Sequence, residues 1–297
     1  PLLLEERGLG DYVIERLGLH GGRDLADWRE MVQKLKHPAG AVEIAVVGKY
    51  VELHDAYMSV KESLAHAGIA NSVDVDIRWI HAETLEARPA ADVLTGVQGV
   101  IVPGGFGERG WEGKVAAARW ARENRVPYLG LCLGMQVMVT EFARNVCGMK
   151  GANTTEIDPE SPYPVISLLD EQQGITNKGG TMRLGVYPCK LIPGSLAARA
   201  YATDVISERH RHRWEFNNAY REVLAAAGLN ASGTSPDGSL VEISEVAGHP
   251  FMLGTQFHPE LQSRPNRPHP LFRDFVAAAC LQGESAAPRD EPAVATA

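Results

Sequence analysis

Between Val42 and Val146 the sequence alternates short apolar runs with stretches of helical periodicity, and this alternation restricts the possible folds more than any other feature. The expected strands are residues 42–47, 73–80, 97–102 and 126–131, and the expected helices are residues 55–67, 111–124 and 133–146. Strands that alternate with helices of this length build a parallel sheet with helices on both faces. The sequence therefore predicts an α/β fold with a doubly wound, mostly parallel, open sheet.

Beyond residue 147 the alternation fades into shorter strands separated by turns, for example at residues 182–191 and 241–246. We expect these strands to form a mixed extension of the same sheet, because antiparallel strands often join an otherwise parallel sheet at its edge. Residues 41–283 are then one domain. Residues 284–297 are rich in Ala, Pro and charged side chains, which predicts a disordered tail.

Residues 1–40 lack the pattern of a compact domain. One face of a predicted helix carries four apolar residues spaced three, four and three positions apart, namely Leu25, Trp28, Val32 and Leu35. Because a lone amphipathic helix must bury its apolar face, we expect residues 1–40 to connect to a domain that precedes Pro1. The chain is therefore expected to be part of a longer protein.

The composition excludes several classes of function. The 297 residues include 29 Lys plus Arg and 37 Asp plus Glu, for a net charge of −8. The scattered basic residues do not form the positive surface of a duplex-binding protein, and no apolar stretch reaches the ~18 residues that a membrane-spanning helix needs. The 4 cysteines form no C-x-x-C pair, which predicts reduced thiols in the cytoplasm rather than a disulfide framework. No metal site is predicted.

Cys132 lies in a Gly-x-Cys-x-Gly motif between a predicted buried strand and a predicted helix. The motif has the spacing of a nucleophile elbow, with cysteine in place of serine. Gly130 and Gly134 permit a sharp turn in which the central residue adopts a strained conformation and exposes its sulfur. The start of the following helix favours the thiolate over the thiol. The alternative interpretation is a core cysteine between two packing glycines.

His258-Pro259-Glu260 is the second candidate for chemistry. In extended backbone, residues two positions apart point the same way, so His258 and Glu260 are expected to share a side. Pro259 fixes its own φ and favours extended geometry at His258. A carboxylate beside an imidazole can keep one ring nitrogen protonated and direct the other towards a thiol. His258 alone could be a surface histidine, but its combination with a cysteine elbow favours catalysis.

The glycine-rich segment Gly104-Gly105-Phe106-Gly107 follows the predicted strand 97–102. A loop of this kind can present backbone N–H groups to developing negative charge. Gly105, Gly107 and Gly110 also match Gly-x-Gly-x-x-Gly, the pattern of a dinucleotide-binding turn. A nicotinamide cofactor is disfavoured, because that pattern normally belongs to the first strand of its domain and the next strand here ends without an acidic residue.

Residues 209–213 form a run of alternating Arg and His. If the run is a strand, its three arginines share one side. Three interpretations stay open, namely a solvated face, a phosphate contact, or a guanidinium that binds a substrate carboxylate as a fork.

The glycine loop, the cysteine elbow and His-Pro-Glu, in this order and spacing, resemble the class I glutamine amidotransferase family. Supporting motifs lie at residues 48–50, 104–107, 130–136, 179–185 and 208–213, and the resemblance extends to about residue 282. It implies the flavodoxin-like fold of that family. It also implies glutaminase activity, in which L-glutamine is hydrolysed to glutamate and ammonia through a cysteinyl thioester.

The resemblance assigns a role to each matching residue. Cys132 would be the nucleophile, His258 the general acid and base, and Glu260 the residue that orients His258. The backbone N–H groups of Gly105 and Leu133 would form the oxyanion hole. Further contacts with the substrate would come from Gly104, Phe106, Gln136, Glu156 and Arg213. Among these, Glu156 would bind the α-amino group and Arg213 the α-carboxylate.

Within this family the chain most resembles glutaminase portions that pass ammonia to a separate synthetase domain. That domain, N-terminal in the same full-length chain, would bind ATP, UTP and Mg²⁺ and aminate UTP to CTP, and the full-length protein would be a homotetramer. That domain is expected to lie outside residues 1–297, because no Gly-x-x-x-x-Gly-Lys-[Ser/Thr] motif follows a predicted strand in them, and no cofactor is expected in this chain. GTP would be an allosteric activator, with Arg109, Gly113 and Arg183 as candidate contacts.

Two other functions remain possible from the sequence. A γ-glutamyl hydrolase or peptidase on the same scaffold would share the cysteine and histidine but would pass no ammonia to a partner. A catalytically weak regulatory or assembly module would carry the same residues without their alignment.

Overall fold

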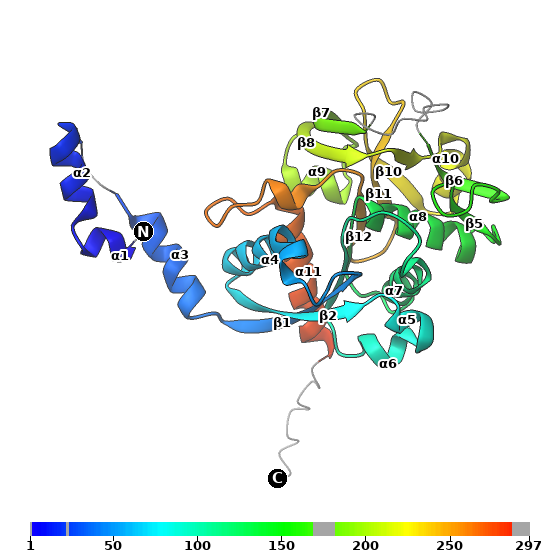
Figure 1. Cartoon of the computed structure of the whole chain (residues 1–297), viewed down its shortest axis with the longest axis horizontal. Helices are drawn as coiled ribbons and strands as arrows, with labels where there is room; N and C mark the ends of the chain where they lie inside the picture. The colour runs from blue at the N-terminus through cyan, green and yellow to red at the C-terminus, as the bar shows by residue number, and fades with distance from the viewer. Residues whose placement is uncertain (1, 22–23, 169–181, 287–297) are drawn as a thin grey trace, which may run out of the picture.

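A computed structural model of the chain describes residues 2–21, 24–168 and 182–286 (Figure 1). Two parts of the predictions, residues 179–181 of the fourth motif and residues 287–297 of the expected tail, lie outside the described residues. The final helix, α11 (Pro270–Ala286), continues past residue 283, where the sequence placed the end of the domain. None of the helices within the described ranges is both long and apolar enough to cross a lipid bilayer.

The strands of the described residues form one large and one small sheet. The large sheet has 9 strands in the order β2-β1-β3-β4-β12-β11-β10-β7-β8, and the small sheet has the order β5-β6-β9. The strands are β1 (Gly40–Gly48), β2 (Val73–His81), β3 (Gly99–Val102), β4 (Tyr128–Leu131), β5 (Ala152–Thr154), β6 (Tyr163–Leu168), β7 (Arg183–Leu191), β8 (Val205–His212), β9 (Trp214–Phe216), β10 (Leu229–Thr234), β11 (Val241–Val246) and β12 (Met252–Thr255).

The large sheet changes character along its width. From β2 through β1, β3 and β4 to β12 neighbouring strands are parallel, whereas β11, β10, β7 and β8 continue the sheet in antiparallel pairs. The predicted strands correspond to β1–β4, β7 and β11, so the doubly wound sheet and its mixed extension are confirmed. The parallel order is that of flavodoxin-like folds, which bind ligands beyond the carboxyl ends of the strands where the strand order reverses.

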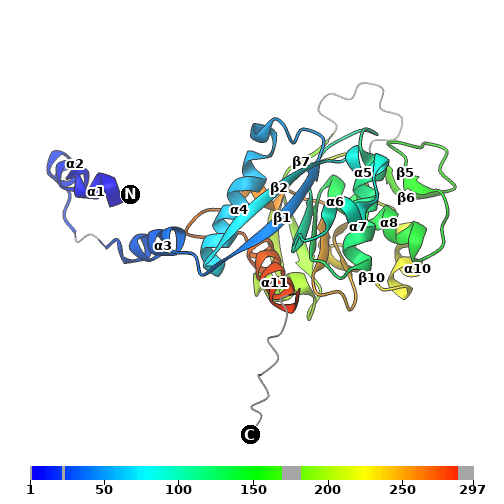
Figure 2. The ribbon, with the colours of Figure 1, turned by 90° about the horizontal axis from the view of Figure 1, so that it is seen from below.

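Helices cover both faces of the sheet (Figure 2). α7 (Trp111–Glu123) and α8 (Leu133–Asn145) bury Trp111, Met138 and Phe142 in one hydrophobic core. α4 (Met58–Asn71) and α11 bury Leu64 and Phe275 in the other. The helix predicted at 55–67 begins as a 3-10 turn, η1 (His54–Tyr57), before α4. Shorter helices are α5 (Thr84–Ala87), α6 (Ala90–Leu94), α9 (Leu196–Tyr201) and α10 (Arg221–Ala226).

The N-terminal segment consists of α1 (Leu2–Glu6), α2 (Leu9–Leu17) and α3 (Ala26–Lys36), which lie to one side of the sheet (Figure 1). The predicted amphipathic helix is α3. Its Trp28 and Met31 line a cavity together with Ile69 of α4 and with Pro265 and Pro268. Part of the apolar face of α3 therefore packs against this chain itself, although Leu35 remains 60% exposed.

Candidate functional site

Cys132 forms a sharp turn between β4 and α8. Its backbone has φ 51° and ψ −98°, a conformation that costs a non-glycine residue free energy. The turn is held by the N–H of Cys132, which donates to the carbonyl oxygen of Thr255 over 2.7 Å. A Cβ atom on Gly134 would lie 2.0 Å from the backbone oxygen of Val102, and one on Gly130 would lie 2.5 Å from Gly134. Both glycines are therefore required sterically, and the predicted elbow is found.

The sulfur of Cys132 lies at the N-terminal end of a 13-residue helix, α8. Unpaired N–H groups and the helix dipole give this end positive potential, which stabilises a thiolate. Cys132 is only 3% exposed. A negative charge on this sulfur therefore depends on protein donors rather than on water.

His258 and Glu260 contact each other directly, because Nδ1 of His258 lies 2.7 Å from Oε1 of Glu260. Their backbone is not extended as predicted. Pro259–Leu261 is a 3-10 turn, η4, that begins after His258. The predicted contact between the two side chains is therefore present. It is formed by the 3-10 turn and not by the alternation of an extended strand.

The electrostatics of the site favour a protonated His258. Burial lowers the pKa of His258, but the charge of Cys132, a hydrogen bond with Cys132 and the contact with Glu260 together raise it to about 11. Because Nδ1 donates to Glu260, Nε2 is the nitrogen available to the sulfur. The geometry therefore supports a protonated imidazole that faces the sulfur of Cys132.

A cavity of about 290 Å³ joins these side chains to the glycine loop, which we define as residues 103–110. Its lining includes Gly104, Gly105, Phe106, Cys132, Arg209, Arg211, His258 and Glu260. A Cβ atom on Gly104 would approach Cε1 of His258 to 2.8 Å, so the loop passes directly over the imidazole. The structure thus brings together three motifs from distant parts of the sequence.

Several polar contacts fix the glycine loop. The Lys49 ammonium donates to the carbonyl oxygen of Phe106, and Nζ of the buried Lys114 lies 3.4 Å from the carbonyl oxygen of Arg109. The N–H of Gly107 donates to Oε1 of Glu156 over 2.9 Å. Sequence reasoning gave neither lysine a role, although Lys49 lies in the supporting motif at residues 48–50, since a lysine on a helix or after a strand is normally solvated.

The other predicted substrate residues lie around α8 and do not line the 290 Å³ cavity. Gln136, on the first turns of α8, donates from Nε2 to the carbonyl oxygen of Trp214 over 3.0 Å and to Oε1 of Gln256 over 3.3 Å. Glu156 contacts the glycine loop, and Arg213 is half-buried directly after β8. Leu133, whose N–H was predicted for the oxyanion hole, begins α8, and its Cδ2 would lie 3.4 Å from a Cβ atom on Gly105.

The three candidate GTP contacts do not share one surface. Arg109 is 51% exposed, lies over the ring of Tyr50 at 5.1 Å and approaches Glu83 to 3.4 Å. Gly113 is buried in α7, where a Cβ atom would lie 1.8 Å from the backbone oxygen of Ala82. The Arg183 side chain is only 11% exposed and forms a 2.7 Å ion pair with Glu242.

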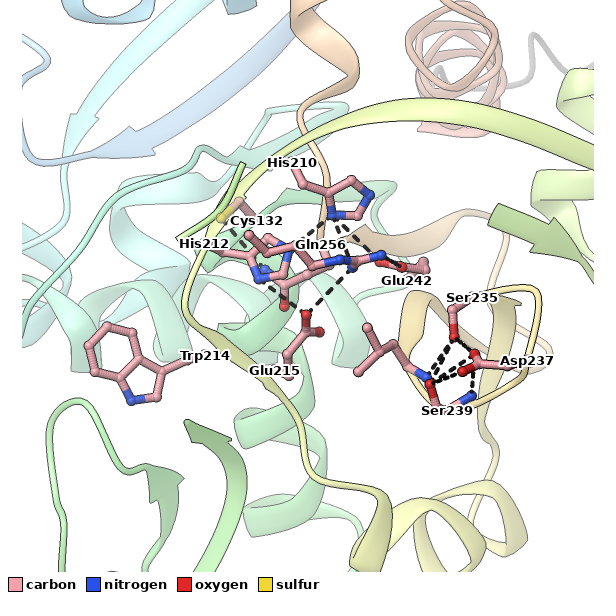
Figure 3. Close-up of polar contacts among 12 residues, drawn as sticks. Cys132, His210, His212, Trp214, Glu215, Ser235, Asp237, Ser239, Glu242 and Gln256 are labelled. Atoms are coloured by element: carbon pink, nitrogen blue, oxygen red, sulfur yellow. Dashed lines mark hydrogen bonds and ion pairs between the residues drawn. The ribbon is translucent and has the colours of Figure 1, made fainter. Parts of the chain in front are cut away.

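Arg183 belongs to a buried ionic cluster whose other members are His210, His212, Glu215 and Glu242 (Figure 3). The alternation of β8 explains it, because Arg209 and Arg211 face outwards while His210 and His212 face inwards. Burial and neighbouring positive charges lower the pKa of His212 to about 3, and burial with the charge of His212 lowers that of His210 to about 2. Residues 209–212 of the run therefore belong to a two-sided strand, and Arg213 follows it. In the described residues no group of three His, Cys, Asp or Glu side chains could hold a metal ion.

Comparison with known proteins agrees with this geometry. Residues 52–278 match the family model of class-I glutamine amidotransferases. A CTP synthase from Dehalococcoides mccartyi is 60% identical over 280 residues, which is 94% of this chain and 52% of that protein. A CTP synthase from Roseiflexus sp. is 61% identical over 281 residues, which is 94% of this chain and 50% of that protein. The chain thus spans about half the length of the curated relatives it matches.

A solved structure described as the glutaminase domain of Trypanosoma brucei CTPS with bound acivicin is also similar. The two structures have a TM-score of 0.75 and 43% sequence identity, and the match covers 81% of this chain and 94% of that chain. By sequence and by structure, the chain belongs to the class I glutamine amidotransferases and, within them, to the glutaminase domains of the CTP synthase family.

Proposed function

We propose that this chain hydrolyses the side-chain amide of L-glutamine to glutamate and ammonia. The observation that carries the proposal is the juxtaposition of a strained, buried Cys132 with His258, whose Nδ1 is held by Glu260 at 2.7 Å. A nucleophile, a base and a residue that orients the base are the parts that acyl transfer from an amide requires.

In the first half of the reaction the thiolate of Cys132 attacks the side-chain carbonyl carbon of glutamine. The resulting oxyanion accepts hydrogen bonds from the N–H groups of Gly105 and Leu133, which lie on the two segments that meet at the cavity. His258 donates its Nε2 proton to the amide nitrogen, the C–N bond breaks, and ammonia leaves. The product on the enzyme is a γ-glutamyl thioester.

In the second half neutral His258 removes a proton from water, and the resulting hydroxide attacks the thioester carbonyl carbon. The C–S bond breaks, the thiolate of Cys132 re-forms, and glutamate leaves. Glu260 stabilises the imidazolium in both halves and keeps Nε2 directed at the reacting atoms.

The charges of the substrate's amino-acid end match the side chains near α8. We propose that Glu156 binds the α-amino group and that Arg213 binds the α-carboxylate, because opposite charges attract strongly in a partly buried site. Gly104 and Phe106 would contact the substrate from the glycine loop, where both line the cavity. Gln136 would lie near the substrate from the α8 side.

The ammonia is proposed to serve a synthetase domain in the same full-length chain. The relatives twice as long as this chain are named CTP synthase, which supports formation of CTP on residues outside residues 1–297. We propose that those residues bind ATP, UTP and Mg²⁺ and aminate UTP. On this proposal residues 1–40 connect the domains, residues 41–283 are the glutaminase, and the full-length protein is a cytoplasmic homotetramer. GTP would act at the exposed Arg109 side of the glycine loop, since a direct contact with Arg183 would require its ion pair with Glu242 to open.

Ammonia release from L-glutamine tests the activity directly. We expect Cys132→Ala to lower the rate by at least about 10⁴-fold, because removal of a nucleophile leaves only binding and oxyanion stabilisation. Cys147→Ala is the matched control and should retain activity, since Cys147 lies at the far end of α8. An electrophilic glutamine analogue should modify Cys132 and none of the other cysteines.

Two outcomes would contradict the proposal. Equal ammonia release by Cys132→Ala and by the unaltered chain would show that Cys132 is not the nucleophile. Rapid hydrolysis of γ-glutamyl peptides with no turnover of free glutamine would instead support a γ-glutamyl hydrolase.

A further inference from the structure

A buried amide contacts the reacting sulfur. Gln256 is the first residue after β12 and is 0% exposed. Its Nε2 lies 3.6 Å from Sγ of Cys132 (Figure 3), and its backbone N–H donates to the carbonyl oxygen of Glu242 over 2.8 Å. Both ends of this residue are therefore fixed inside the protein.

The orientation of the Gln256 amide follows from a main-chain atom two contacts away. The carbonyl oxygen of Trp214 can only accept, so the Gln136 group 3.0 Å away from it must be the NH₂. The second hydrogen of that NH₂ points to Gln256 at 3.3 Å, so Gln256 must present its oxygen there. The NH₂ of Gln256 consequently faces the sulfur.

Reversal of either amide would be unfavourable. A flipped Gln136 would place its oxygen against the oxygen of Trp214, and a flipped Gln256 would place an oxygen against a negatively charged sulfur. The two buried amides thus form a chain with one direction, Trp214 to Gln136 to Gln256 to Cys132. Its last member is a hydrogen-bond donor to the thiolate.

We propose that Gln256 donates a hydrogen bond to the thiolate of Cys132 and that Gln136 acts as a positioning residue, which fixes the direction of this donor. The role of both residues in the reaction rests on the proposed glutaminase function. Gln136 then acts on the nucleophile, in addition to its expected place near the substrate.

The chemistry of the two steps explains why a neutral donor is useful. His258 is the other donor to the sulfur, but it loses its proton to the departing ammonia. The N–H of Gln256, in contrast, is directed at the sulfur whenever the sulfur is negatively charged, before it attacks glutamine and again when the thioester breaks, because an amide does not titrate. Because Cys132 is only 3% exposed, water cannot replace this hydrogen bond to the thiolate.

The test is the pH dependence of Cys132 alkylation by iodoacetamide in the full chain, because only the thiolate reacts. Loss of a donor to a charged group should raise the midpoint of alkylation by about one pH unit in Gln256→Met, which is about a tenfold slower reaction below the midpoint. The plateau rate at high pH should be unchanged. Gln136→Met should shift the midpoint in the same direction by less, since Gln256 then loses only its orienting partner.

Gln98→Met is the matched control, because it removes a half-buried amide whose oxygen accepts from the N–H of Glu43, on a different strand pair from Cys132. Its midpoint should equal that of the unaltered chain. Gln256→Leu supplies a second apolar replacement, which decides the question if Gln256→Met does not fold. The charged and ionisable side chains that share the cavity with the sulfur are the same in all variants, namely His258 and Glu260 from the segment after β12 and Arg209 and Arg211 from β8.

An unchanged midpoint in the folded Gln256 variants would overturn the inference. The result is separable from the proposed function. If the midpoint shifts but the unaltered chain releases no ammonia from glutamine, Gln256 is a donor to the thiolate and the proposed glutaminase function is wrong. If the unaltered chain releases ammonia but the midpoint does not shift, only the role of Gln256 is wrong.

Discussion

The two ring nitrogens of His258 have partners from widely separated parts of the sequence. Cys132 lies more than a hundred positions earlier, and Glu260 lies on the adjoining 3-10 turn. Because these partners raise the pKa of His258 to about 11, the imidazolium form persists at neutral pH despite burial. The histidine therefore begins the reaction as an acid, ready to protonate the departing amine.

Removal of the Glu260 charge should change both the rate and its pH dependence. In Glu260→Gln we expect ammonia release to fall by about 10² to 10⁴-fold, as for other residues that orient a catalytic histidine. The pKa of His258 should fall towards its ordinary value, so activity should be lost at a lower alkaline pH than in the unaltered chain. A pH profile of kcat/KM measures this shift, and an unmoved alkaline limb would show that Glu260 does not act on His258.

Lys114 should make stability depend on pH in the alkaline range. Burial, with the charge of Lys49, lowers its pKa from 10.5 to about 8 in the folded protein. Between these values the unfolded chain binds more protons than the folded one, so the free energy of unfolding should rise with pH there. At pH 7 both states are protonated and the folded state carries the cost of a buried charge.

Lys114→Met should therefore raise the free energy of unfolding at pH 7 by about 1 to 3 kcal/mol, and the gain should shrink as the pH approaches 10. Urea denaturation at pH 7, 8.5 and 10 measures the difference. Lys61→Met, at an exposed position of α4, is the control and should be nearly neutral at each pH. A gain that stays constant with pH would contradict the assignment.

At the scale of elements, the elbow depends on close contact between α8 and the adjacent strand β3. The backbone oxygen of Val102 would lie 2.0 Å from any Cβ at position 134, a distance that only backbone movement can relieve. The glycine therefore permits the helix to begin directly behind the strand. This approach sets the direction in which Cys132 presents its sulfur.

Gly134→Ala should accordingly destabilise the protein by about 3 kcal/mol or more, which is the upper range for overpacking. It should also reduce glutaminase activity in whatever folded protein remains, because the turn at Cys132 must open. Gly40→Ala is the control, since a Cβ atom there meets nothing within 4 Å. Thermal unfolding of both variants tests this, and equal melting temperatures would refute the steric argument.

At the scale of the whole molecule, the N-terminal helices contribute little to the core. Within α1 and α2 no described side chain is buried, and Leu3, Tyr12 and Leu17 are each more than 60% exposed. Among the described residues of this segment, α3 packs against the domain, where Trp28 and Ile69 of α4 line the same cavity. The catalytic motifs instead lie at the carboxyl ends of the parallel strands, where the fold brings them into one cavity.

Removal of residues 1–18 should therefore change the free energy of unfolding by less than about 1 kcal/mol, because it exposes no buried side chain. Removal of residues 1–38 should cost more, since it also deletes α3. Urea denaturation of both truncated chains measures the two steps. A large loss with the shorter truncation would show that α1 and α2 stabilise the domain.

Local spacing was sufficient for much of this protein. The spacing of the apolar residues predicted β1 to β4 and the helices α7 and α8. A strand or helix that is buried on one or two faces needs apolar residues at regular, nearby positions of the sequence. The occurrence of a Gly-x-Cys-x-Gly motif together with His-Pro-Glu predicted which side chains meet in the cavity, because the two motifs seldom occur together by chance. The family followed from the same residues.

Tertiary structure alone decided the contacts between residues distant in sequence. Nothing near Arg183 in the chain indicated its burial against Glu242, and nothing near His258 indicated that a 3-10 turn would form its contact with Glu260. The direction of the Gln256 amide depends on a backbone oxygen at Trp214 through Gln136. The physical reason is that apolar periodicity and turn chemistry are local, whereas hydrogen-bond direction and buried charge depend on the partners that folding brings into contact.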